Sequence, residues 1–169
     1  MTTMTATAPV AYTTRNDLAE DTRSLLIDML NRLLADAVDL ATQVKVAHWN
    51  VKGPTFMALH ELFDDVHADI QEYSDLLAER AVQLGGIAAG TARTAGNLSE
   101  LDEYPMRVMT GTAHVEAVAD RLAAFGARTR SAIDEADRFG DQATADLFTE
   151  ITRGVDKWLW FVEAHTQER

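Results

Sequence analysis

The feature that most constrains the fold is the spacing of apolar residues between residues 17 and 50. They recur at intervals of three and four, which places them along one stripe of a helix. No segment of the chain shows the alternation of apolar and polar residues that is typical of a strand. The sequence therefore predicts an all-α fold that begins with a long amphipathic helix. The stripe consists of Leu25, Leu26, Met29, Leu30, Leu33, Leu34, Val38, Ala41 and Val44.

Glycine and proline divide the rest of the chain into three further long helices. The second helix is expected to begin near Pro54, because proline is tolerated mainly in the first turn, and to stop at Gly85 and Gly86. The third is expected over 111–139, and Asp141 can cap the fourth. The apolar positions expected to face inwards in these last two helices are Val115, Val118, Leu122, Phe125, Ile133, Leu147, Ile151, Val155, Leu159 and Val162.

A long connection, rich in glycine and alanine, separates the second and third helices. A connection of this length usually crosses a bundle, and we expect it to carry a short helix near residues 99–101. These elements predict a four-helix bundle with one long crossover, which is the ferritin-like topology. Residues 1–16 are rich in threonine and alanine and lack periodicity, so they are interpreted as a flexible arm before a single bundle domain over 17–169.

The composition limits the kinds of partner and site. A formal net charge of −12 disfavours binding to nucleic acid or to an anionic membrane through the body of the protein. Cysteine is absent, so only oxygen and nitrogen ligands remain for a metal. No stretch approaches the length of a membrane span, and no basic cluster followed by an apolar run opens the chain, so we expect a cytoplasmic protein.

Two histidines and three acids have spacings that suit metal ligation: His48, His60, Asp64, Asp75 and Glu79. On the second helix, His60 and Asp64 are four residues apart, as are Asp75 and Glu79, so each pair projects from one face. The two pairs share that face but stand about 16 Å apart at the rise of an α-helix. Metal–ligand bonds are only about 2 Å long, so one ion cannot contact both pairs of one chain.

The separation between the two pairs predicts a site shared by two subunits. Antiparallel copies of the second helix, related by a two-fold axis, would bring His60 and Asp64 of one chain against Asp75 and Glu79 of its mate. His48 ends the preceding helix, and the hairpin sets it level with His60. We therefore predict two such sites in each dimer.

The remaining histidines and two tryptophans have structural interpretations. His67 lies three residues after Asp64 and is interpreted as a secondary or surface residue. His114 and His165 have no ligand-spaced partners, and we expect both on the surface. Trp158 and Trp160 lie among apolar residues of the fourth helix and are expected in the core or at a subunit contact.

The residues around these candidate ligands resemble the Dps family of small ferritins. The resemblance covers essentially the whole chain, and the matching motifs are AHWNVKGP at 47–54, LH at 59–60, FD at 63–64, DLLAER at 75–80 and LGG at 84–86. It implies a di-iron ferroxidase centre, formed by the five candidate ligands between two subunits, within a shell of twelve subunits that stores oxidised iron. The resemblance implies Fe(II) and hydrogen peroxide as substrates and protection from oxidative damage as a function.

The same resemblance suggests roles for two further features. Trp49 would donate an electron to stray oxidising species, although its simplest interpretation is packing at a dimer interface. Asp141, Asp146 and Glu150 would line an acidic pore at a three-fold axis, whereas their simplest interpretation is capping of the fourth helix.

One departure from the family bears on nucleic acid. Many members bind DNA through a lysine-rich arm, but residues 1–16 contain a single basic residue, Arg15. DNA binding is therefore expected to be weak or absent near physiological salt. Two alternative functions are a dinuclear-metal hydrolase, in which the same ligands hold zinc and activate water, and a structural protein that compacts the nucleoid.

Overall fold

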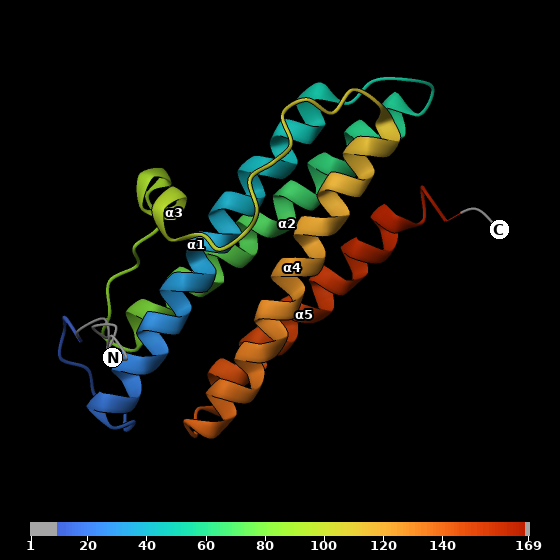
Figure 1. The fold of residues 1–169 in the computed structure, drawn as a ribbon. Coiled ribbons are helices and arrows are strands. Elements are labelled where there is room, and N and C mark those ends of the chain that lie inside the picture. Colours follow the sequence, from blue (N-terminus) through green and yellow to red (C-terminus); the bar gives the residue numbers. More distant parts are fainter. Residues whose placement is uncertain (1–9, 168–169) are drawn as a thin grey trace, which may run out of the picture.

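Four long helices lie side by side in the computed structural model, which describes residues 10–167 (Figure 1). This range contains helices and no strand. A short fifth helix lies in the connection between the second and third long helices. The predicted all-α, ferritin-like bundle is therefore confirmed. The elements are α1 (Glu20–Asn50), α2 (Phe56–Gln83), α3 (Ala92–Leu98), α4 (Gly111–Arg138) and α5 (Gln142–Glu163).

The helices form two antiparallel hairpins, α1 with α2 and α4 with α5 (Figure 1). The segment between α2 and α4 runs back along α1, so that α4 starts at the same end of the bundle as α2. As a result α2 and α4 run in the same direction. The long connection is the predicted crossover, because a short loop would have made these two helices antiparallel.

Apolar side chains of all four long helices meet in one core. Its largest wholly buried members are Phe63, Phe125 and Phe148, from α2, α4 and α5. Burying a side chain of this size contributes about 1.5–3 kcal/mol to stability. The predicted stripe of α1 is largely buried, but Leu25 is 40% exposed and lies at its edge.

Two helix boundaries differ from those predicted. The first helix begins at Glu20, because the side chain of Asn16 accepts a hydrogen bond from the backbone N–H of Leu18 (3.0 Å) and holds a non-helical turn there. The prediction of a short helix at 99–101 was wrong in position, since α3 ends at Leu98. The hydroxyl of Ser99 donates to the carboxylate of Asp39 (2.7 Å), which draws the chain out of the helix.

A buried carboxylate ties the crossover to the bundle. Asp36 of α1 is wholly buried and accepts hydrogen bonds from the backbone N–H of Glu100 (2.8 Å) and from Nε of Arg128 on α4 (2.5 Å). Burial raises the pKa of Asp36, although these hydrogen bonds act to lower it. Asp36 thus connects α1, α4 and the crossover at one point.

The segment before α1 is attached to the far end of α2. The backbone N–H groups of Ala11 and Tyr12 both donate to the carbonyl of Gly85 (2.9 Å each). Gly85 has a φ of +90°, a conformation that favours glycine. Residues 1–9 of the predicted arm lie outside the described part of the chain. Among residues 10–167, no helix is both long and apolar enough to cross a membrane.

Candidate metal centre

The α1–α2 hairpin brings two predicted ligands into direct contact. His48 is in the last turn of α1, and His60 is in the second turn of α2. Between the helices the chain turns through Gly53, whose φ of +112° favours glycine. The imidazole rings stack with centroids 3.7 Å apart and an interplanar angle of 19°. The hairpin therefore sets the two histidines level, as the sequence predicts.

Hydrogen bonds fix which nitrogen of each ring is free. Nδ1 of His48 lies 2.7 Å from the carbonyl oxygen of His60, and Nδ1 of His60 lies 2.9 Å from that of His48. A carbonyl oxygen only accepts, so both Nδ1 atoms must carry hydrogen and donate. Each Nε2 then has a lone pair, and neither has a hydrogen-bond partner within residues 10–167. This is the usual arrangement of metal-binding histidine, in which one nitrogen is oriented by a hydrogen bond and the other binds.

The third ligand predicted on this side, Asp64, is already paired with a lysine. Its carboxylate accepts a hydrogen bond from Nζ of Lys45, and it lies 3.9 Å from Nδ1 of His48. The hydrogen bond from Lys45 is the main reason why the pKa of Asp64 is lowered. A cation that binds Asp64 must therefore compete with an ammonium group.

The remaining predicted ligands, Asp75 and Glu79, are exposed on the same helix as His60. Within residues 10–167 neither has a hydrogen-bond or ion-pair partner. No three histidine, aspartate or glutamate side chains in the described part of this single chain are arranged to hold a metal ion. Completion of the centre by a second subunit is therefore a proposal that rests on the helix geometry.

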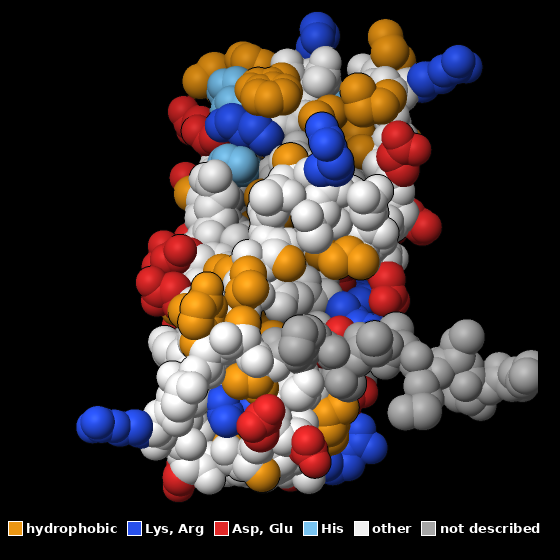
Figure 2. Space-filling model, turned by 90° about the vertical axis from the view of Figure 1, so that its left-hand side faces the viewer, with side chains coloured by type: hydrophobic (Ala, Val, Ile, Leu, Met, Phe, Trp, Pro, Cys, Tyr) orange, Lys and Arg blue, Asp and Glu red, His pale blue; other side chains and the backbone are white. Residues whose placement is uncertain are grey.

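The tryptophans occupy three different environments. Trp49, next to His48, is 66% exposed. Trp158 is buried, and its Nε1–H donates to the carboxylate of Asp69 (2.7 Å). Trp160 is 62% exposed, so a core position is confirmed for Trp158, and a subunit contact stays the prediction for Trp160. Figure 2 shows apolar side chains and histidines near the α1–α2 turn. Large apolar residues exposed at the end of α1, at the start of α2 or before α4 are Trp49, Phe56, Met57, Met106 and Met109.

The other histidines also differ from one another. His67 is half-buried, and its Nδ1–H donates to the carbonyl of Ala41 (2.8 Å). His165 is exposed, as predicted. The prediction of a surface position for His114 was wrong, because its side chain is 1% exposed. The hydroxyl of Tyr104 lies 2.6 Å from its Nδ1, and this contact makes burial of the imidazole possible. No spacing rule connects these two residues in the sequence.

The acidic cluster at the start of α5 is not uniform. Asp146 and Glu150 are exposed, but Asp141 is 4% exposed and forms an ion pair with Arg80 (2.8 Å). Its side chain also accepts from the backbone N–H of Thr144 (3.2 Å), so the capping interpretation is confirmed for Asp141.

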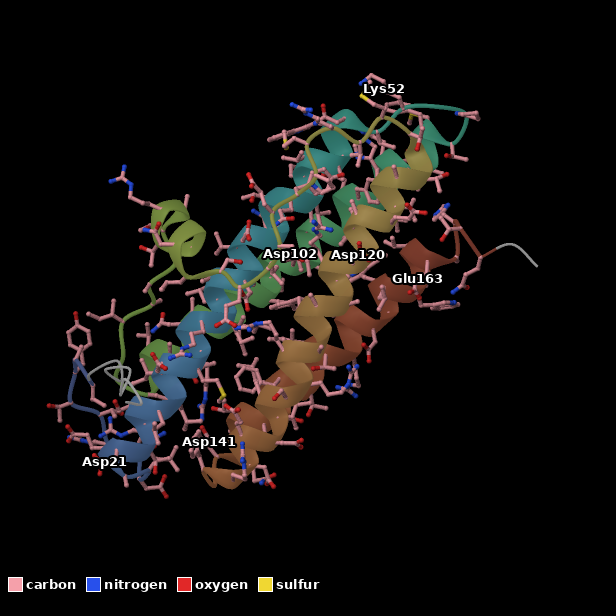
Figure 3. All side chains as sticks on the ribbon, viewed as in Figure 1. Asp21, Lys52, Asp102, Asp120, Asp141 and Glu163 are labelled. Atoms are coloured by element: carbon pink, nitrogen blue, oxygen red, sulfur yellow. The ribbon has the colours of Figure 1, made fainter. Side chains whose placement is uncertain are left out.

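The buried position of Asp141 affects both its pKa and the pore proposal. Burial acts to raise the pKa, but hydrogen bonds from Thr144 and Arg80 outweigh it, and the net shift is downward. Asp141 and the α1–α2 turn, marked by Lys52, lie at opposite ends of the bundle (Figure 3). A role in lining a pore remains a proposal for Asp146 and Glu150. The carboxylate of Asp141 instead forms an ion pair with Arg80.

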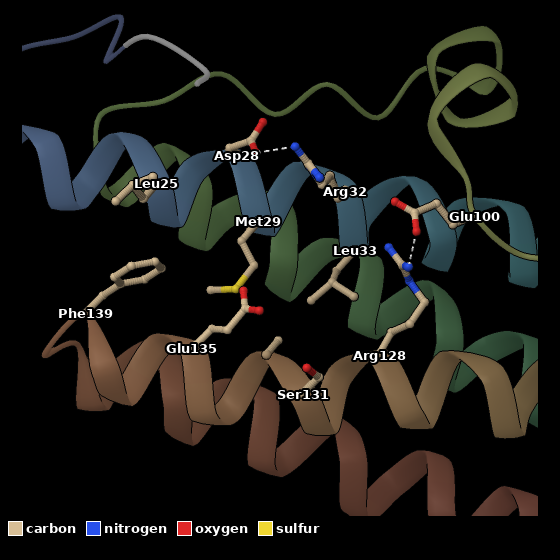
Figure 4. Close-up of a pocket in the computed structure, with 11 residues that line it drawn as sticks. Leu25, Asp28, Met29, Arg32, Leu33, Glu100, Arg128, Ser131, Glu135 and Phe139 are labelled. Atoms are coloured by element: carbon tan, nitrogen blue, oxygen red, sulfur yellow. Dashed lines mark hydrogen bonds and ion pairs between the residues drawn. The ribbon is translucent and has the colours of Figure 1, made fainter. Parts of the chain in front are cut away.

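A cavity of about 360 Å³ lies between α1 and α4 (Figure 4). Its floor is apolar and includes Met29 and Leu33. Both arginines at its wall are paired within the chain, Arg32 with Asp28 at 2.9 Å and Arg128 with the carboxylates of Asp36 and Glu100. No unpaired cation is left there to bind an anionic ligand, so the α1–α2 face is the better candidate site.

Comparison with known proteins agrees with the fold and the motifs. The ferritin-like domain model matches residues 27–169. The chain is 42% identical over 158 residues to the "DNA protection during starvation protein" of Agrobacterium fabrum, covering 94% of this chain and 98% of that protein. The protein of the same name from Brevibacillus brevis is 32% identical and covers 84% of this chain and 95% of its own length.

Solved structures give the same result. DpsA14 from Streptomyces coelicolor superposes with a TM-score of 0.90 at 31% identity and 96% coverage of both chains. A Dps structure from Mycobacterium smegmatis has a TM-score of 0.86 at 29% identity, with 97% of this chain and 94% of that chain covered. The bundle with its crossover is thus a ferritin-like domain. Within that class the chain belongs to the Dps family.

Proposed function

We propose that this protein is a mini-ferritin that oxidises Fe(II) with hydrogen peroxide and stores the ferric product in a hollow shell. The substrate ions would bind between His48, His60 and Asp64 of one subunit and Asp75 and Glu79 of the next. Two ions would bind at each site, and zinc could substitute for iron there. The twelve-subunit shell is carried over from the family resemblance.

The observation that supports this most is the reciprocal hydrogen bonding of His48 and His60. It orients two imidazoles before any ion arrives and leaves both Nε2 atoms as ligands. Nitrogen together with carboxylate oxygen is a donor set that ferrous iron accepts. Asp75 and Glu79 are exposed, and neither has a partner within the described chain. Their carboxylates are therefore available to a cation that the histidines of a partner subunit hold.

Paired binding explains why the proposed reaction would protect the cell. Two ferrous ions held close together supply the two electrons that reduce one hydrogen peroxide to water. The carboxylates offset the added positive charge, and Asp64 exchanges Lys45 for the ion when the site fills. Asp146 and Glu150 would attract cations towards the interior.

We propose that protection does not depend on tight DNA binding. The net charge is −12, and Arg15 is the one basic residue in positions 1–16. Binding to phosphates by counterion release requires several cations. Gel-shift experiments at increasing salt test this, and a complex that survives at physiological salt would overturn it.

Iron oxidation is tested on the assembled protein with a matched pair of variants. The protein is loaded anaerobically with Fe(II) and given one hydrogen peroxide for every two irons while ferric absorbance and trapped hydroxyl radical are recorded. Asp75→Ala/Glu79→Ala should lose rapid oxidation and keep its assembly. The control is Glu116→Ala/Asp120→Ala, which removes an exposed acidic pair of the same spacing from α4.

The two variants give opposite results if the proposal is right. The wild type and the α4 variant should oxidise iron quickly with little radical, and the α2 variant slowly with much radical. Equal rates in all three would place the centre elsewhere. Metal-dependent hydrolysis without redox change would favour the dinuclear hydrolase instead.

A further inference from the structure

Tyr104 and His114 form a buried pair that the proposed metal centre does not use. Tyr104 is 5% exposed and His114 is 1% exposed. The phenol oxygen lies 2.6 Å from Nδ1 of the imidazole, and the two rings are inclined by 19°. Tyr104 belongs to the crossover and His114 to the first turn of α4.

The phenol has one hydrogen-bond partner, and this partner is a base. Within residues 10–167 the hydroxyl of Tyr104 contacts no other acceptor, so its proton points to Nδ1 of His114. Burial raises the pKa of Tyr104 to about 12, so the phenol keeps its proton in ordinary conditions. Burial, together with nearby Lys52, lowers the pKa of His114, and the contact with the phenol makes Nδ1 the accepting nitrogen of the ring.

The pair lies against the end of α1 that carries the candidate metal centre. Tyr104 and His114 share a cavity of about 200 Å³ with Val46 and Asn50, which flank His48 and Trp49 in the sequence. Because Asn50 directly follows Trp49 on α1, the pair lies within one helix diameter, about 10 Å, of the Trp49 backbone. Such a separation permits electron transfer without direct contact.

We propose that Tyr104, with His114 as its proton acceptor, is an electron-donating residue that re-reduces Trp49 after stray oxidant has attacked it. This rests on the proposed function: a centre that holds one ferrous ion in place of two reduces hydrogen peroxide by one electron, to hydroxide and a hydroxyl radical. The radical takes one electron from Trp49 and becomes hydroxide. Oxidised Trp49 then takes one electron from Tyr104.

The proton and the electron of Tyr104 go to different acceptors, the proton to His114 and the electron to Trp49. The phenol O–H bond breaks, its proton forms an N–H bond with Nδ1 of His114, and a neutral tyrosyl radical remains. Because the proton stays within the hydrogen bond, the buried phenol loses an electron without forming a cationic radical. A later ferrous ion supplies the electron that restores the phenol, and the proton returns from His114.

The chain contains a matched control for this role. Tyr73 of α2 is half-buried, and its pKa is also raised to about 12, mainly by burial. Unlike Tyr104, it has no hydrogen-bonded base within the described residues. The chain has three tyrosines in all, so a radical signal can be assigned by two substitutions.

The experiment is rapid-freeze electron paramagnetic resonance on the assembled protein, with one Fe(II) per centre and excess hydrogen peroxide. Wild type and Tyr73→Phe should show the same tyrosyl radical, and Tyr104→Phe should lose it. His114→Gln, which can form a hydrogen bond but is a far weaker base, should lower the yield at least severalfold. In the wild type and in Tyr73→Phe, high-field spectra should show the reduced gx value of a hydrogen-bonded tyrosyl radical.

A second arm separates failure of this inference from failure of the proposed function. Metal-free protein is oxidised photochemically with a ruthenium trisbipyridyl complex and persulfate. A tyrosyl signal that persists in Tyr104→Phe, or a wild-type radical without a hydrogen bond, overturns the inference in either arm. If Fe(II) is not oxidised at all, the proposed function fails and so does the link to the metal centre. The photochemical arm then still decides whether Tyr104 is the donor.

Discussion

Nδ1 of His48 donates to the carbonyl of His60, and Nδ1 of His60 donates to the carbonyl of His48, at 2.7 and 2.9 Å. The hairpin that connects α1 and α2 therefore holds both imidazoles in the tautomer that presents Nε2. We predict that ¹⁵N NMR of the metal-free protein at mildly alkaline pH will show both rings protonated at Nδ1. Addition of Zn²⁺ should shift the Nε2 resonances of these two residues and leave those of His165 in place. Protonation at Nε2 in the metal-free protein would contradict the orientation described here.

The lysine beside Asp64 should weaken metal binding. Lys45→Met removes the ammonium group that pairs with this carboxylate, so the pKa of Asp64 should rise towards its ordinary value. Exposed ion pairs are worth about 0.2–1 kcal/mol, so Zn²⁺ affinity should rise by a factor of about 1.4 to 5. Isothermal titration measures this against Lys157→Met, which removes an exposed lysine that stacks on Trp158. Equal affinity in the two variants would show that Lys45 does not compete with the ion.

The ion pair between Asp141 and Arg80 should make a pH-dependent contribution to stability. Removing one partner of a buried pair costs about 3–5 kcal/mol, so Asp141→Ala should unfold at a much lower denaturant concentration. Asp146→Ala, at an exposed position of the same helix, should change the free energy of unfolding by about 0.5 kcal/mol or less.

The sign of the pH effect follows from the lowered pKa of Asp141. A carboxyl group whose pKa is lower in the folded state stabilises the fold above its unfolded-state pKa, whose ordinary value is 3.8. That contribution is lost as the pH falls through the lower, folded-state pKa. The difference between wild type and Asp141→Ala should therefore be full at neutral pH and shrink below about pH 4. A difference that grows on acidification would contradict the assignment.

Gly85 should be intolerant of a side chain. A Cβ there would lie 2.6 Å from the carbonyl oxygen of Tyr12, and the φ of +90° disfavours any other residue. Gly85→Ala should cost about 1–3 kcal/mol and loosen the segment before α1. Gly96→Ala is the control, because a Cβ in α3 meets nothing within 4 Å and alanine favours helix. Hydrogen exchange of the amide groups of Ala11 and Tyr12 would report the loosening, and equal protection in both variants would contradict it.

The sequence predicts the helices well because their signals are local. Periodicity and glycine or proline positions are enough to locate α1, α2, α4 and α5 to within a few residues. The short helix was misplaced, because the Ser99 hydroxyl bonds to Asp39, sixty residues earlier. Contacts between distant segments produce no periodic pattern in the sequence.

The same limit applies to side chains at the candidate site. Helical spacing groups His60 with Asp64 and Asp75 with Glu79, and the hairpin adds His48. Spacing does not reveal that Asp64 is paired with Lys45, nineteen residues earlier. Nor does it show that His114 is buried against Tyr104, or that Asp141 is turned towards Arg80. Each of these depends on which helices pack together.

The central claim is that each metal centre takes ligands from two subunits, and complementation between two inactive chains tests it most directly. One chain carries His48→Ala/His60→Ala, and the other carries Asp75→Ala/Glu79→Ala. In a mixed dimer one site contains every substitution, but the other combines the intact histidines of one chain with the intact acids of its partner. Co-refolded mixtures should therefore recover rapid Fe(II) oxidation, although each variant alone is inactive. If the mixture is as inactive as its parents while mixed dimers are present, the centre is not shared between subunits.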